Sequence, residues 1–296
     1  MKDKIKNSKY FKPLSYVVFF IIIFFFSFYY TLPTDEIRGI IISGIEMNTP
    51  FEAKLGAVSI APIVSVKVQD LELYRGGELY VKLEDVKMRP SLFSLLSKYL
   101  RLPFRAKLMS GVVKGNLIYD NKTGQIVGIN AKLSGIDVEK FHPIMAGYLG
   151  MTDEQLTGIL HGDFSLDFSS ETSGVFSLKI DNMSISNFRL IGFPIPPFKD
   201  LESIFTGKIE DGVTKVDELS FKGNDFDLNM YGSIPPLWNI TKGAKIDLMI
   251  NLNILSDEAK IGIVRSFLSP KGDGTLGGKI LGTFGNPKVV RDTRRQ

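Results

Sequence analysis

Apolar and polar residues alternate along most of this chain, and this period of two predicts β-strands. The alternation is clear at 64–68, 79–83, 164–168, 176–180 and 226–230, and its longest run extends from Ile246 to Ile254. Strands with one apolar and one polar face are typical of antiparallel sheets. Turns rich in Gly, Asn and Asp separate these runs, for example at 75–77, 120–124 and 222–225. The pattern predicts a mainly β fold built on a largely antiparallel sheet.

A few short segments have helical character instead. Ser256–Leu268 is the best of them, because Ser256 is a suitable N-cap and Ser269-Pro270 ends the pattern. Ser91–Leu100, Asp137–Leu149 and Lys199–Phe205 are weaker candidates. Thr34–Ile45 is interpreted as a connection that leads to the first strand.

Glycine pairs introduce several of the predicted strands. Gly-x-x-x-Gly occurs at 111–115, 158–162 and 274–278, each time leading into an apolar run. Glycine inside a strand usually marks a bulge or a bend, so this weak repeat predicts a curved and twisted sheet.

The N-terminus carries the longest uninterrupted apolar stretch. Leu14 to Tyr30 contains no charge, Gly or Pro. As a helix it would cover about 25 Å, close to the ~30 Å hydrocarbon core of a bilayer, and extension to Pro33 adds the missing length. Residues 14–33 are therefore predicted to be a transmembrane anchor, with these representative positions: Leu14, Phe20, Ile22, Phe25 and Tyr29. A cleaved signal peptide is the alternative, but the run exceeds a usual signal core and no small-x-small cleavage site follows it.

Charge around this stretch predicts its orientation. Five lysines precede it, namely Lys2, Lys4, Lys6, Lys9 and Lys12, against Asp3 alone. The positive-inside rule places residues 1–13 in the cytoplasm and residues 34–296 across the membrane, as a single-pass protein. The Pro-rich connector at 193–198 is a candidate boundary inside that domain.

Composition narrows the function classes. The net charge of +4 lies entirely in the first dozen residues, so the exported part is formally neutral and a nucleic-acid partner is not expected. The absence of Cys excludes disulfides, thiolate metal sites and a Cys nucleophile.

Candidate chemistry is sparse. His142 and His161 are the two histidines and lack metal-ligand spacing, while Asp163 and Asp167 lie on the polar side of a predicted strand. Gly272–Gly277 matches G-x-G-x-x-G but follows a predicted helix and precedes a strand, the reverse of a dinucleotide fold. The chain is therefore predicted to be no enzyme and to bind no metal or cofactor.

Several segments together resemble a known family. They are Val86–Leu96, Leu108–Gly115, Leu133–Phe141, Leu156–Leu166 and Gly274–Val289, the last with the ending Gly-Thr-Phe-Gly-Asn-Pro. Their Gly and apolar spacing resembles the type II secretion system protein N (GspN) family and the wider AsmA-like group of periplasmic proteins. The resemblance implies an inner-membrane anchor, a curved β-rich periplasmic domain and no catalytic residues.

Two functions follow as hypotheses. One is a structural role in a type II secretion system, with other secretion components as partners. The other is lipid binding or transfer, with phospholipid in an apolar groove of the sheet. For the groove, the expected lining residues are Phe164, Leu166, Phe168, Ile246, Leu248 and Ile250. If the apolar face closes on itself, the same residues form an ordinary core.

Overall fold

A computed structural model describes most of the chain beyond the N-terminal stretch. The described ranges are 34–61, 65–89, 97–141, 155–187, 189–190, 193–194, 197–236, 241, 243–256 and 267–291, together with Tyr16, Phe19, Phe20, Ile23 and Ser27.

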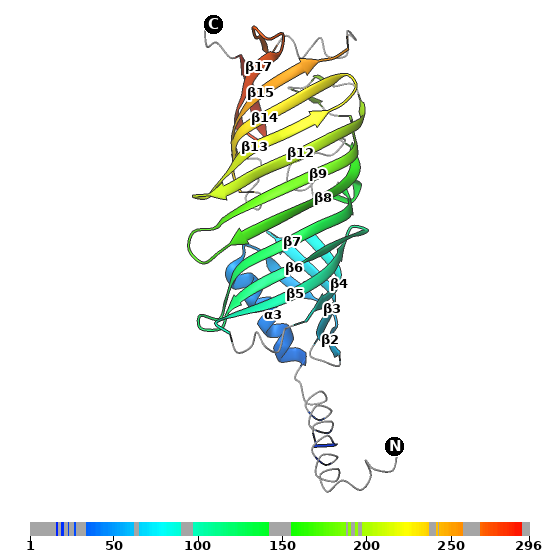
Figure 1. The fold of residues 1–296 in the computed structure, drawn as a ribbon, viewed down its shortest axis with the longest axis vertical. Coiled ribbons are helices and arrows are strands. Elements are labelled where there is room, and N and C mark those ends of the chain that lie inside the picture. The colour runs from blue at the N-terminus through cyan, green and yellow to red at the C-terminus, as the bar shows by residue number, and fades with distance from the viewer. Residues whose placement is uncertain are drawn as a thin grey trace, which may run out of the picture.

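One 16-stranded sheet forms the body of the molecule (Figure 1). Its strands are β1 (Glu52–Leu55), β2 (Val58–Ala61), β3 (Ser65–Arg75), β4 (Glu78–Met88), β5 (Tyr99–Leu108), β6 (Gly111–Asp120), β7 (Gln125–Asp137), β8 (Gln155–Asp167), β9 (Ser173–Ser186), β12 (Phe198–Glu210), β13 (Val213–Lys222), β14 (Phe226–Ile234), β15 (Lys245–Ile254), β16 (Ser269–Pro270), β17 (Leu276–Thr283) and β18 (Asn286–Arg291). The strand pairings within the described residues are antiparallel, and from β3 to β15 neighbours in the sheet follow one another along the chain. The mainly β, antiparallel prediction is confirmed. A separate two-stranded ribbon joins β10 (Arg189–Leu190) to β11 (Phe193–Pro194).

Helix α3 (Thr34–Asn48) packs on the concave side of the sheet at its N-terminal end. Ile41, Ile42 and Ile45 of α3 pack against a cluster from the first strands, which includes Leu55 and Val68. Thr34–Ile45, to which no secondary structure was assigned from the sequence, lies within this helix. Gly39 and Gly44 weaken the local helix propensity, so the helix depends on this packing.

The other helical predictions have mixed outcomes. Lys199–Phe205 lies inside strand β12, so that prediction is wrong. Residues Val138–Phe141 form the 3₁₀ helix η2, and Tyr99-Leu100 begin β5. The remainder of Ser91–Leu100 and Asp137–Leu149, and most of Ser256–Leu268, lie outside the described residues.

The predicted anchor lies mainly outside the described residues, which include none of Leu14, Ile22, Phe25, Tyr29 or the five N-terminal lysines. Within it, Tyr16, Phe19, Phe20 and Ile23 are helical and exposed, Phe20 at 69%. Among the described residues, no helix has both the length and the apolar content needed to cross a bilayer.

The connector at 193–198 does not interrupt the sheet. Strand β12 pairs directly with β9 from Phe198 to Ile209, so hydrogen bonding continues from one side of the connector to the other. The strands before and after it therefore form one continuous sheet.

Glycines let large side chains lie flat on the concave face. A Cβ at Gly115 would lie 2.1 Å from the carbonyl oxygen of Asn130 and 2.9 Å from Cε1 of Phe104. A Cβ at Gly207 would lie 2.4 Å from the carbonyl oxygen of Lys215 and 2.9 Å from Cζ of Phe176. The sheet can curve tightly here because the space of a side chain on one strand is occupied by a ring from the next.

We expect Gly115→Ala and Gly44→Ala to change stability in opposite directions. At Gly115 the added methyl meets backbone, and this overpacking should lower the free energy of unfolding by about 1–3 kcal/mol. At Gly44, inside α3, nothing lies within 4 Å of the new Cβ. Alanine should stabilise that helix by up to about 1 kcal/mol. Urea unfolding of the two variants measures both effects, and destabilisation by Gly44→Ala would contradict the open surroundings of that residue.

Candidate functional site: the concave apolar face

An unbroken row of apolar residues crosses the concave face of the sheet. Its members are register partners on successive strands: Val66, Met88, Phe104, Gly115, Ala131, Phe164, Phe176, Gly207, Val216, Gly232, Leu248, Ile280 and Val289. The row crosses thirteen strands, from β3 to β18. Twelve inter-strand steps of about 4.8 Å give it a length of roughly 60 Å.

A second inward row runs beside the first. It joins Ala106, Val113, Leu133, Gly162, Leu178, Phe205, Leu219, Met230, Ile250 and Gly278. Neither row contains a polar side chain. Side chains at i and i+2 of a strand share a face, so the two rows form a continuous apolar strip along the sheet.

Several large side chains in this strip stay partly exposed, although Phe176, Met230, Leu248 and Ile250 are buried. Phe104, Phe164, Leu178, Phe205 and Leu219 are half-buried. The rings of Phe176 and Phe205 meet edge to face, with centroids 4.7 Å apart. Within the described residues, α3 packs on one end of the strip and Leu268 packs on Met230 and Ile250, but no second sheet layer covers it. We call this strip the trough.

The predicted lining residues occupy two separate parts of the trough. Phe164 and Leu166 point inward from β8 and are half-buried, whereas Ile246, Leu248 and Ile250 of β15 are buried at 7–8% exposure. Phe168 lies just beyond the end of β8 and donates its backbone N–H to the carbonyl of Val127. Four strands lie between β8 and β15, so these residues line one trough but form no common pocket.

Sequence reasoning missed most of the trough. Phe104, Phe205 and Leu219 also line it, and they are half-buried like Phe164. Leu219 follows a register shift in β13, which moves the inward positions from even to odd numbers. Simple alternation cannot follow such a shift.

A hollow of about 870 Å³ lies at one end of strands β14, β15 and β17. Ile234, Ile246 and Gly282 line it together with Ser233 and Thr283.

Comparisons of the chain with protein-family models, curated proteins and solved structures found no match. The function must therefore be argued from the geometry.

The titratable residues near the trough serve structural roles. His161 Nδ1 accepts the Gly135 N–H at 3.3 Å, where β7 has a register shift. Asp273 accepts hydrogen bonds from the Thr275 N–H and hydroxyl at 3.0 and 2.7 Å, which lowers the pKa of its carboxyl. The G-x-G-x-x-G match at 272–277 thus includes a turn closed by Asp273. Within the described ranges, no group of three or more His, Asp or Glu is placed to hold a metal ion.

Proposed function

We propose that this protein binds the acyl chains of lipids in the trough, as a non-catalytic protein anchored to the inner membrane by residues 14–33. The main support for this proposal is the pair of uninterrupted apolar rows. Phe104, Phe164, Leu178, Phe205 and Leu219 in these rows are only half-buried, so part of the apolar surface of the trough stays accessible to a ligand.

The trough matches the physical needs of an acyl chain. Burial of each CH₂ group contributes about 0.8 kcal/mol, and no polar side chain in the two rows offsets that gain. The length of roughly 60 Å exceeds the ~30 Å hydrocarbon core of a bilayer, so an extended chain fits inside it.

A structural role in type II secretion is the second proposal, and it rests on the family resemblance. In this role the trough binds another secretion component and no lipid. Loss of secretion on deletion, without any lipid bound to the purified protein, would favour it.

Site-specific photo-crosslinking tests the lipid proposal. A benzophenone amino acid is placed at inward Leu178, Phe205 or Leu219, in the full chain purified from membranes without delipidation. We expect phospholipid adducts by mass spectrometry at these positions, because their side chains face the trough.

The outward neighbours Ser177, Thr206 and Glu218 are the matched controls, each next to one inward position. They should give no lipid adducts above background. Equal adducts on both faces, or none on the inward face, would overturn the proposal.

A further inference from the structure

Five basic residues lie in direct cross-strand register on the convex face of the sheet. They are Lys67, Lys87, Arg105, Lys114 and Lys132, on the adjacent strands β3 to β7. All five side chains are exposed. Four steps of about 4.8 Å make this basic stripe about 20 Å long. The residues are far apart in the sequence, so only the register brings them together.

This arrangement opposes the stability of the sheet. Like charges directly opposite one another on neighbouring strands are destabilising. Within the part of the chain that the structure describes, none of the five side chains makes an ion pair or a hydrogen bond. Asp85, close to the stripe, already pairs with Lys107 at 2.6 Å. Asp163 is the register partner of Lys132 at the end of the stripe, and Asp85 lies near enough to Lys67 and Lys87 for both to help lower the pKa of its carboxyl. The stripe therefore keeps a net positive charge with no direct ion pair.

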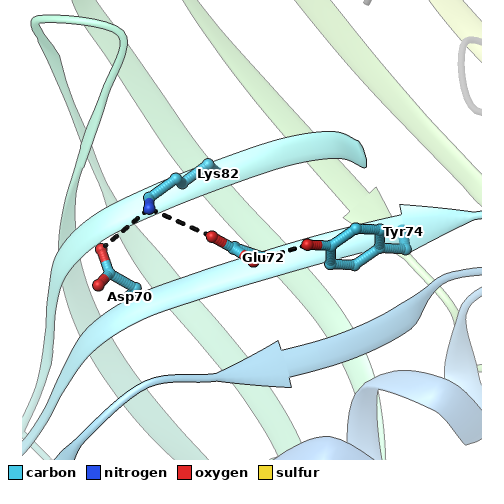
Figure 2. Close-up of polar contacts among 4 residues, drawn as sticks. All are labelled: Asp70, Glu72, Tyr74 and Lys82. Carbon is cyan, nitrogen blue, oxygen red and sulfur yellow. Dashed lines mark hydrogen bonds and ion pairs between the residues drawn. The ribbon is translucent and has the colours of Figure 1, made fainter. Parts of the chain in front are cut away.

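Other outward positions of the same strands are neutralised, as Figure 2 shows. Lys82 Nζ lies 3.2 Å from Glu72 and 3.7 Å from Asp70. The Tyr74 hydroxyl donates to Glu72 at 2.8 Å, and this hydrogen bond, with Lys82, lowers the pKa of Glu72. There one lysine lies between two carboxylates, whereas the stripe has one sign along its whole length.

The end of the stripe forms one rim of a hollow of about 500 Å³. Lys114, Lys132 and Asp163 lie on this rim, and Asn116 and Asn130 lie on the opposite rim. This volume is in the range of small-ligand sites. Flexible ammonium groups beside amide donors suit a phosphate oxygen.

We propose that the basic stripe binds the phosphates of anionic phospholipid headgroups at a membrane surface. Four of its five residues are lysines, each a point charge on a flexible side chain. Such charges suit headgroups that move laterally in a membrane better than they suit a carboxylate fixed in one place. The stripe also lies on strands at the α3 end of the molecule, and α3 directly follows the apolar segment 14–33. The proposal does not depend on acyl chains in the trough, because it concerns the opposite face.

Lysine acetylation footprinting tests the stripe on the full chain. The protein is reconstituted in vesicles of phosphatidylcholine alone or with phosphatidylglycerol, and the modification rate of each lysine is read by mass spectrometry. With the anionic lipid, we expect Lys67, Lys87, Lys114 and Lys132 to react at least about fivefold more slowly, the factor for one charge near an anionic surface. Exposed Lys208, Lys222 and Lys245 should not change. Salt at 1 M, where the Debye length is about 3 Å, should abolish the protection.

Two triple variants with equal charge change serve as a matched pair. Lys87→Gln/Lys114→Gln/Lys132→Gln should remove the protection of Lys67, while Lys208→Gln/Lys222→Gln/Lys245→Gln should preserve it. Exposed substitutions on strands leave the apolar rows intact, so both variants are expected to fold.

Several results would overturn the proposal. Equal protection in both vesicle types would show that anionic headgroups are not recognised. Protection by inorganic phosphate in detergent would indicate a site for a free anion instead. Protection that grows with protein concentration in detergent would show that a second copy covers the stripe, and no protection at all would leave it a solvated surface.

Discussion

Leu201→Ala is expected to lower the free energy of unfolding by about 2–5 kcal/mol. Leu201 is 2% exposed and packs in a cluster with Met183 and Phe226. A Cβ at Gly223 would lie 2.5 Å from its Cδ2 atom, so the side chain is tightly enclosed. Truncation to Ala removes this packing and leaves a cavity, which adds to the lost transfer free energy.

Urea unfolding of the full chain measures this effect. Leu79→Ala is the matched control, because it removes the same atoms from a leucine that is 42% exposed. Leu79→Ala should lower the free energy of unfolding by about 0.5 kcal/mol or less. Similar losses in both variants would show that the β12 cluster is not a stabilising core.

The strands were the most predictable part of this fold. The alternating runs at 164–168 and 246–254 correspond to β8 and β15, except that β8 ends at Asp167. In a strand with one buried face, every second residue is apolar, so the strand can be predicted directly from the sequence.

Departures from regular alternation were not predictable in the same way. Leu201, Ile204 and Phe205 have helical spacing, but Leu201 and Phe205 are four positions apart and therefore also share the inward face of a strand. The helix α3 was missed because two glycines dilute its pattern, and its stability comes from contacts with β-strands that local sequence does not contain.

The two functional surfaces depend on register, which periodicity alone does not determine. Phe164 was recognised as inward-facing, but its neighbours Ala131 and Phe176 are identified only by strand pairing. The same holds for Lys87 and Arg105 on the convex face, which are 18 positions apart in the sequence and directly opposite in the sheet. The strand register thus brings residues that are distant in the sequence together into an apolar trough and a basic stripe.

Leu178→Asp is expected to abolish lipid binding in the trough. Leu178 is half-buried between Gly162 and Phe205 in the second inward row, and a Cβ at Gly162 would lie 2.7 Å from its Cδ2 atom. A carboxylate at this place would need water, which an acyl chain in the trough excludes. The same desolvation should lower the free energy of unfolding by roughly 1–3 kcal/mol.

The loss of bound lipid is measured by native mass spectrometry with lipid analysis, on protein purified without delipidation. Leu178→Ala separates stability from function, because it removes packing but keeps the position apolar and should retain lipid. Ser177→Asp places the same charge on the convex face and should also retain it.

The pH dependence of Leu178→Asp gives an internal check. Burial beside an acyl chain raises the pKa of a carboxyl, because the charged form is desolvated. Lowering the pH towards about 4 should protonate the introduced carboxyl and restore lipid binding, while wild type shows no such gain. Retention of lipid by Leu178→Asp at neutral pH would place the ligand elsewhere and reject the trough as its site.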